Sequence, residues 1–258
     1  MKDINSQIIL FYPYIIDTFQ LFQNVPIKSS LKISQGNPEM TSPNNISFEQ
    51  KESLAKETIN NVLSLAKNPC ICFSGGKKSL VLLHLIKSVT KIQLPVIFID
   101  TSVHFENTCH YVEKMRKLWR FPLVTVIARE HIDNIAQDTD ICCNSLIITP
   151  LCENIQKTGF DYVFIGSVKA ENRMKRLFDT HPGKKECISV SPIDHFLDED
   201  IWKYIHAFNL PYCSLYDSEY TRIDCKTCSQ IDDSRQKNSL MPNEEELIKE
   251  KLKKLGYL

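Results

Sequence analysis

The 258-residue sequence lacks the features that mark several large classes of protein. No apolar run approaches the roughly 20 residues that a helix needs to cross a bilayer. The apolar run at 8–16 contains Pro13 and no small-residue cleavage site, so we do not interpret it as a signal peptide. The formal net charge is zero, which argues against a general nucleic-acid or membrane surface and still permits a local basic pocket. There is no internal repeat. We therefore expect a cytoplasmic protein.

Cysteine, in contrast, is plentiful. Ten cysteines are many for an intracellular enzyme, yet the chain is long enough to bury a core without disulfide bonds. Cys70, Cys72 and Cys109 fall in predicted strands and helices and are expected to be small core residues. The informative cysteines are the adjacent pair Cys142-Cys143 and the C-x-x-C segment Cys225-Lys-Thr-Cys228. A C-x-x-C alone is compatible with zinc, a redox pair, a cluster or chance.

Apolar runs with the length of strands alternate with helical patterns along most of the chain. The predicted strands are 69–73, 95–99, 122–127, 161–165 and 187–191. The predicted helices are 47–66, 76–89, 106–118, 131–137, 146–158, 198–207 and an amphipathic helix at 244–254. This alternation predicts an α/β fold, a doubly wound and mostly parallel sheet of about five strands that is covered on both faces.

Composition divides the chain into three parts. Residues 1–47 carry clusters of Pro, Asn and Ser and are expected to be a partly ordered extension. Residues 48–230 hold the alternating pattern and form the predicted main domain. Residues 231–258 form a tail with the amphipathic helix.

The stretch Phe73-Ser-Gly-Gly-Lys-Lys-Ser79 joins the first predicted strand to a helix. Ser74, Gly75 and Gly76 supply a tight turn, Lys77 and Lys78 two cations, and Ser79 a hydroxyl. Such a turn can present backbone N–H groups and a helix N-terminus to an anion at the carboxyl edge of a parallel sheet. It is not a Walker loop. The alternative is an ordinary turn with two surface lysines.

Several segments, in order, resemble the PAPS/APS reductase (phosphoadenylyl- and adenylyl-sulfate reductase) family of the adenine-nucleotide α-hydrolase-like superfamily. The resemblance covers about residues 69–230, and the ordered set is far more specific than any one segment. The segments are Ser74-Gly-Gly-Lys-Lys-Ser79 (family S-G-G-K-D-S), Val96 to Thr101 with His104-Phe-Glu-Asn-Thr, Gly166 to Arg176, Pro192-Ile-Asp194, Asp198 to Trp202, Leu210-Pro-Tyr212, Leu215-Tyr-Asp217 and Tyr220-Thr-Arg-Ile-Asp-Cys225.

The resemblance implies a nucleotide site. It places phosphate or phosphosulfate on the loop and on a basic segment, and the nucleoside near the end of the second strand. The implied residues are Ser74, Gly75, Gly76, Lys77, Lys78, Ser79, Asp100, Thr101, Gly166, Lys169, Arg173 and Arg176. Within the basic segment it favours Lys169 and Arg176 as the ligand-facing pair. A turn or capping role for Asp100, and a solvated basic face for the segment, are the alternatives.

Lys78 departs from the family pattern. ATP-using members usually carry aspartate there, where a carboxylate helps to organise the metal and nucleotide. A lysine removes that acid and adds a cation, which favours binding of a preformed sulfonucleotide over cleavage of ATP.

The two cysteine pairs resemble the iron–sulfur ligand set of APS reductases. This implies that Cys142, Cys143, Cys225 and Cys228 hold a 4Fe-4S cluster, for which four thiolates suffice. An all-cysteine zinc site is the alternative, although adjacent cysteines suit tetrahedral zinc poorly. Two unrelated reduced pairs are also compatible with the sequence.

One family feature is absent. The reductases attack sulfur with a cysteine in a C-terminal E-C-G-x-H-type segment, and this sequence has no cysteine after Cys228. Cys187 and Cys213 have no motif support, so no catalytic residue is identified.

The resemblance predicts a sulfonucleotide reductase of assimilatory sulfur metabolism that releases sulfite and an adenosine phosphate. Its expected partners are APS or PAPS and a thioredoxin-like or other electron donor, and a homo-oligomer is compatible with the sequence. The alternatives are an ATP-using sulfate adenylyltransferase subunit or nucleic-acid thiolation enzyme, and a non-catalytic nucleotide- and cluster-binding partner.

Overall fold

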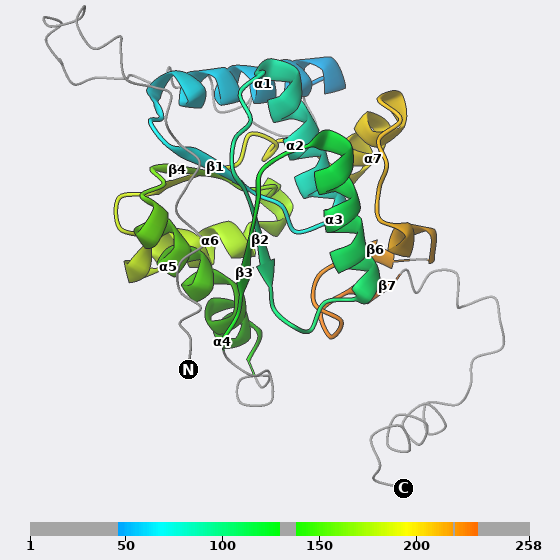
Figure 1. Cartoon of the computed structure of the whole chain (residues 1–258). Helices are drawn as coiled ribbons and strands as arrows, with labels where there is room; N and C mark the ends of the chain where they lie inside the picture. The colour runs from blue at the N-terminus through cyan, green and yellow to red at the C-terminus, as the bar shows by residue number, and fades with distance from the viewer. Residues whose placement is uncertain (1–45, 130–137, 219, 232–258) are drawn as a thin grey trace, which may run out of the picture. The chain divides into compact units, whose positions relative to one another are not determined.

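The computed structural model describes residues 46–129, 138–218 and 220–231 (Figure 1). The predicted helices at 131–137 and 244–254 lie outside the described residues, as do nearly all of the N-terminal extension and the C-terminal tail. No helix within the described ranges is both long enough and apolar enough to span a bilayer.

A five-stranded parallel sheet forms the centre of the fold, as the sequence predicts. Its strands are β1 (Pro69–Cys72), β2 (Val96–Asp100), β3 (Leu123–Ile127), β4 (Tyr162–Phe164) and β5 (Ile188–Val190). Their spatial order is β3-β2-β1-β4-β5, and every neighbouring pair is parallel. The chain therefore runs outward from β1 to one edge and then crosses to β4 on the other side. The carboxyl ends of β1 and β4 flank the point at which the strand order reverses, where open α/β sheets bind ligands.

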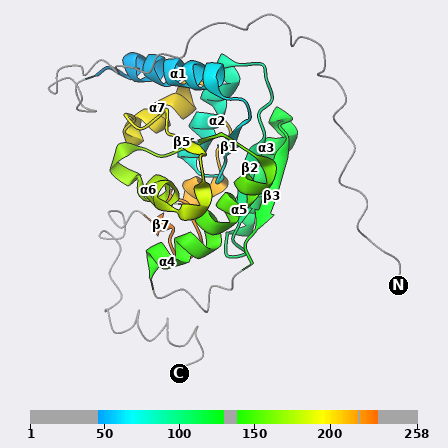
Figure 2. The same cartoon turned by 90° about the vertical axis from the view of Figure 1, so that its left-hand side faces the viewer.

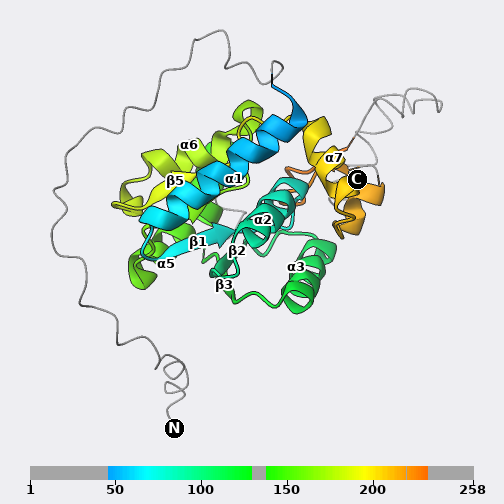
Figure 3. The same cartoon turned by 90° about the horizontal axis from the view of Figure 1, so that it is seen from above.

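Helices cover both faces of the sheet (Figures 2 and 3). They are α1 (Phe48–Leu65), α2 (Lys77–Val89), α3 (Glu106–Trp119), α4 (Thr139–Cys143), α5 (Thr149–Thr158), α6 (Arg173–Thr180) and α7 (Asp198–Ala207). One apolar core joins α1, α2, α3 and α7 to the sheet, and a second joins α5 and α6 to the other face. Successive residues of β1 point to opposite faces of the sheet: Ile71 packs in the first core and Cys70 in the second.

The positions at which α1 and α7 begin follow from the residues of their first turns. Ser47 and Gln50 form a capping box at the start of α1, in which each side chain accepts the other's backbone N–H. Three acidic residues open α7, where the helix dipole favours negative charge. One of them, Asp200, forms a buried ion pair of 2.6 Å with Lys51 of α1, so the first and last helices of the core are linked by charge as well as by packing.

The region around Cys142 and Cys143 differs from the prediction. The helix expected at 146–158 is preceded by α4 and by a π-helical turn at Asn144–Ile148, before α5 begins at Thr149. Such wide turns are rare and frequently occur at functional sites. After α7 the chain ends its described part in a small antiparallel hairpin, β6 (Tyr220–Arg222) and β7 (Gln230–Ile231).

Candidate active site

A pocket of about 210 Å³ lies at the switch point of the sheet. Four segments that are distant in sequence line it: the β1–α2 loop, the turn between β4 and α6, the π-helical turn and the β6–β7 hairpin. Its polar and ionisable lining residues are Cys72, Ser74, Lys77, Lys78, Ser79, His104, Cys143, Ser167, Glu171, Arg173, Tyr216, Thr221, Arg222, Asp224, Cys225 and Cys228.

The β1–α2 loop adopts the turn that its glycines predict. Gly75 has a φ of 79°, and a Cβ there would lie 2.9 Å from Thr108 Cγ2, so both conformation and space require glycine. The loop satisfies much of its own polarity: Ser79 Oγ donates to the Gly76 carbonyl at 2.8 Å, and Gly76 N–H donates to Ser74 Oγ at 3.3 Å. Within the described residues, the N–H groups of Lys78 and Ser79 have no acceptor, so they remain open to an anion at the start of α2.

The two lysines of the loop have different environments. The Lys77 side chain is 4% exposed; its ammonium pairs with Asp198 at 2.7 Å and lies 5.1 Å from the Trp202 ring centroid. The Lys77 N–H donates to the Tyr216 hydroxyl at 2.9 Å. Lys78 instead pairs with Glu171 at 2.5 Å. Lys77 therefore ties the loop to α7, and Lys78 is the lysine available to a ligand.

The basic segment reaches the pocket through a different residue from the favoured pair. Arg173 lines the pocket, and its guanidinium donates to Cys143 Sγ at 3.4 Å. Arg176 has 60% of its side chain exposed and pairs with Asp140, while Lys169 is exposed and outside the lining. The geometry thus favours Arg173 over Lys169 and Arg176.

Gly166 has a packing role. A Cβ at this position would lie 2.8 Å from both the Cα and the N of Ser79, so glycine lets the end of β4 approach the first turn of α2. This contact brings the loop and the basic segment together at one edge of the sheet.

Asp100 and Thr101 lie at the end of β2, as predicted, but outside the pocket lining. Asp100 Oδ1 accepts the Ser102 N–H at 2.8 Å, which is the turn role that the sequence left as the alternative. Thr101 is buried, and its hydroxyl lies 3.3 Å from Cys225 Sγ. Thr101 therefore supports the hairpin cysteines.

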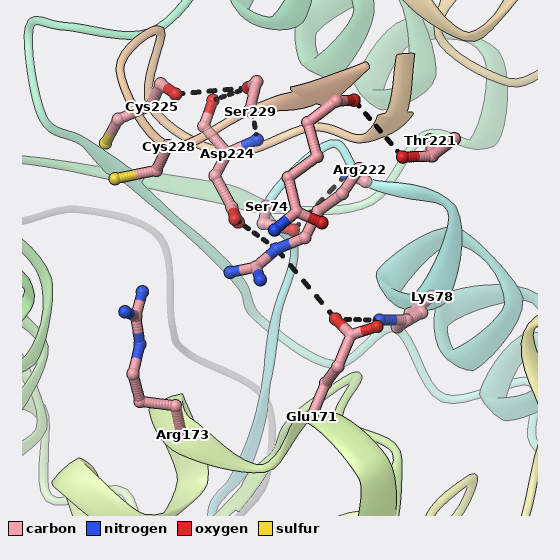
Figure 4. A network of polar contacts seen from close by, with 12 residues as sticks. Ser74, Lys78, Glu171, Arg173, Thr221, Arg222, Asp224, Cys225, Cys228 and Ser229 are labelled. Atoms are coloured by element: carbon pink, nitrogen blue, oxygen red, sulfur yellow. Dashed lines mark hydrogen bonds and ion pairs between the residues drawn. The ribbon is translucent and has the colours of Figure 1, made fainter. Parts of the chain in front are cut away.

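Three charged residues that were not among the predicted site residues complete the pocket: Glu171, Arg222 and Asp224 (Figure 4). Arg222 Nε lies 2.5 Å from Asp224 Oδ2 and 3.9 Å from Glu171 Oε2. Burial raises the pKa of Asp224, and Arg222 opposes that rise. Burial also acts to raise the pKa of Glu171, but Lys78 and Arg222 hold it below its usual value. In the sequence, only their positions could have indicated that Glu171 and Asp224 belong to the site: Glu171 lies between Lys169 and Arg173, and Asp224 precedes Cys225.

The four predicted ligand cysteines converge on this region. Cys142 and Cys143 end α4, and Cys225 and Cys228 lie in the hairpin, where the Cys228 N–H donates to the Cys225 carbonyl at 2.9 Å. All four are free thiols. Burial raises the pKa of Cys143 to about 11; Arg173 lowers it, and the other three cysteines add smaller increases. Cys225 and Cys228 are shown with Arg173 in Figure 4.

Within the part of the chain that the structure describes, three of these cysteines line the pocket, and Cys142 adjoins Cys143 at the end of α4. In that part of the chain, no set of three His, Cys, Asp or Glu residues stands in position to hold a metal ion. The donor chemistry nevertheless fits an iron–sulfur cluster, because the four residues are all cysteines: Cys143, Cys225 and Cys228 line one pocket, and Cys142 is the neighbour of Cys143 in the chain.

Comparison with known proteins gives a consistent family. Residues 68–231 match the model of the phosphoadenosine phosphosulfate reductase domain. An adenosine 5′-phosphosulfate reductase of Bacillus cereus strain Q1 is 30% identical over 168 residues, which cover 60% of this chain and 70% of that protein. A protein of the same name from a second strain of Bacillus cereus is 29% identical over 203 residues, covering 72% of this chain and 85% of that one.

Solved structures share the fold at lower identity. A phosphate complex of phosphoadenylyl-sulfate reductase from Candida auris has a TM-score of 0.56 and 19% identity, covering 72% of this chain and 98% of that chain. An FMN adenylyltransferase from Candida glabrata has a TM-score of 0.58 and 18% identity, covering 74% of this chain and 66% of that chain. At this identity both similarities concern the fold alone.

Proposed function

Because the chain belongs to the phosphoadenosine phosphosulfate reductase domain family, we propose that it is a sulfonucleotide reductase of sulfur assimilation that converts APS or PAPS to sulfite and an adenosine phosphate. The observation that carries the proposal is one pocket at the switch point of the sheet that combines cations with cysteines. The cations match the acidic end of a sulfonucleotide, and the thiols match the chemistry of sulfur reduction.

The reaction requires two electrons. A thiolate attacks the sulfate sulfur, the bond from sulfur to the phosphate oxygen breaks, and the adenosine phosphate departs with that electron pair. A second thiol then attacks the sulfur of the first thiol, so that sulfite leaves with the electron pair of the broken S–S bond and a disulfide remains. We propose that a thioredoxin-like or other thiol donor, in the cytoplasm, restores the thiols.

Three basic residues of the pocket are positioned to bind the acidic end of the nucleotide. Lys78, Arg173 and Arg222 would bind and orient the negatively charged oxygens, with the open N–H groups at the start of α2. The rest of the predicted nucleotide-binding set stays a prediction, and the attacking cysteine is not assigned.

We further propose that Cys142, Cys143, Cys225 and Cys228 hold a 4Fe-4S cluster, with zinc as the alternative. When bound, such a cluster supplies a redox-active iron centre. The proposal is supported by three of these cysteines, Cys143, Cys225 and Cys228, which line one pocket. Arg173 contacts Cys143, and Thr101 contacts Cys225. Both contacts are of the kind that orients and tunes thiolate ligands.

Anaerobic purification tests the cluster. The protein should be brown and contain iron and sulfide at about four per chain each. Cys228→Ser should lose both. Cys109→Ser is the matched control, because this free cysteine of α3 lies outside the pocket lining. Stoichiometric zinc without sulfide would contradict the cluster.

A direct assay tests the reaction. APS or PAPS with a dithiol or thioredoxin should yield sulfite, whereas ATP with sulfate should yield no pyrophosphate. Lys78→Asp should weaken sulfonucleotide binding by about 1–3 kcal/mol, because it replaces a pocket cation with an anion. Magnesium-dependent pyrophosphate release from ATP, without sulfite from either sulfonucleotide, would favour the ATP-using alternative.

A further inference from the structure

Glu171 places its carboxylate beside two cations of the pocket, Lys78 and Arg222. It ends the 3-10 turn Lys169–Glu171 between β4 and α6, and its carboxylate contacts cations from two other segments. One of its oxygens lies 2.5 Å from Lys78 Nζ of α2 and 3.9 Å from Arg222 Nε of the hairpin. Figure 4 shows this carboxylate between the two cations. A phosphate or sulfate that binds both Lys78 and Arg222 must therefore displace Glu171.

The contacts of Glu171 are suited to exchange. Its side chain is 43% exposed, so solvent reaches the ion pair and weakens it. Lys78 and Arg222 hold the pKa of Glu171 below its usual value despite burial, and the carboxylate therefore carries its charge at neutral pH. Glu171 lies on a short turn that has no buried residue, so its side chain can leave Lys78 and Arg222 without disturbing the core.

The carboxylates also limit the charge that the pocket accepts. Lys77 of the lining is paired with Asp198. The other lining cations, Lys78, Arg173 and Arg222, share the pocket with the two acids Glu171 and Asp224, and Asp224 is held 2.5 Å from Arg222. A 3′-phosphate adds about two negative charges to an adenosine nucleotide. Two resident acids oppose that addition by like-charge repulsion.

We propose that Glu171 is a specificity-determining residue: it holds the anion position between Lys78 and Arg222, yields it to the acidic end of the nucleotide, and disfavours nucleotides that carry a 3′-phosphate. The inference rests on the proposed function for its choice of nucleotide. It assigns Arg222 as the second cation of the anion position and predicts a preference for APS over PAPS.

Calorimetric binding tests it without turnover or an intact cluster. The probes are inorganic phosphate, AMP and adenosine 3′,5′-bisphosphate, titrated into the full chain. Glu171→Gln should tighten phosphate binding about three- to tenfold, because it removes the competing charge and keeps the shape of the side chain. It should tighten the bisphosphate more than AMP, so that the unaltered protein's preference for AMP shrinks about tenfold or disappears.

Two further variants separate charge from folding. Glu171→Asp retains the charge and should bind phosphate about as weakly as the unaltered protein. Glu186→Gln is the same substitution at an exposed position outside the pocket lining and should change nothing. Thermal unfolding of each variant confirms that the fold is intact.

Unchanged or weaker phosphate binding by Glu171→Gln overturns the inference, and so does an unaltered ratio of AMP to bisphosphate affinity. The phosphate titration involves no sulfonucleotide chemistry. A failure to produce sulfite from APS or PAPS would therefore count against the proposed function, whereas the phosphate titration would still test the role of Glu171.

Discussion

At the scale of single residues, Gly75 and Gly76 are neighbours with different constraints. Gly75 combines a φ of 79° with a contact of 2.9 Å to Thr108 Cγ2, so Gly75→Ala should lower the free energy of unfolding by about 1–3 kcal/mol. At Gly76 the nearest atom to a Cβ is 3.4 Å away, and Gly76→Ala should cost less than about 1 kcal/mol. Urea unfolding measures both. Equal losses would show that the loop is not held against α3 as described.

His84 should make the stability of the fold depend on pH. It lies in α2, its Nδ1 is 2.9 Å from the Tyr204 hydroxyl, and burial lowers its pKa from the usual 6.5. The unfolded chain therefore takes up a proton at His84 at higher pH than the folded chain does. The stability that the neutral ring contributes is present above about pH 6.5 and is lost as the pH falls below it. Urea unfolding from pH 7.5 to pH 5 should show a smaller fall for His84→Gln than for the unaltered protein. Parallel curves for the two proteins would exclude this role.

The pocket also shows which residue-level predictions sequence reasoning can support. The glycine turn and the convergence of two cysteine pairs on one region follow from motifs that name residue types at fixed spacings. The separate environments of Lys77 and Lys78 do not, because they depend on Asp198 and Glu171, which are distant in sequence. Arg173, rather than Arg176, faces the pocket because α6 begins at Arg173, and no pattern marked that start.

At the scale of elements, one buried ion pair joins α1 to α7. Lys51 is 4% exposed and pairs at 2.6 Å with Asp200, which also accepts the Leu197 N–H at 2.7 Å. Lys51→Met should destabilise the fold by about 3–5 kcal/mol, because it leaves a carboxylate buried without its cation. Adding Asp200→Asn should recover part of this loss, since the amide removes the charge and can still accept the N–H.

The matched control for that pair is Lys56→Met. Lys56 and Glu52 are also 2.6 Å apart in α1, but the lysine is 40% exposed, so the expected loss is below about 1 kcal/mol. Denaturant unfolding compares the two variants. Similar losses would mean that the Lys51–Asp200 pair does not link the helices in solution.

The strands were predicted to within about a residue or two because each is an apolar run bounded by polar residues. Helices α2, α3 and α7 were predicted for the related reason that their apolar faces repeat regularly. The π-helical turn at Asn144–Ile148 was missed because its wider turn breaks that period. The hairpin strands β6 and β7 were missed because they are too short to show an alternating pattern.

At the scale of the whole molecule, a formal net charge of zero limits long-range attraction for an anionic nucleotide. Affinity should therefore come from the local cations of the pocket. We expect the association rate with AMP, measured by stopped flow, to fall less than about threefold between low and physiological salt. A steep dependence would indicate a broader basic field around the pocket.

The β6–β7 hairpin is the last part of the pocket in the chain, and this fixes when the pocket can exist. The sequence places Cys225 82 residues after Cys143. A ribosome that adds roughly 5–20 residues per second reaches Cys225 about 4–16 s later. The last two strands of the sheet, β4 and β5, are made within that interval, and the wall that carries Arg222, Asp224 and two of the four cysteines follows them. Each newly made molecule therefore passes through a stage in which Cys142 and Cys143 exist without Cys225 and Cys228, so the cluster proposed above can form only after the last strand of the sheet has been made.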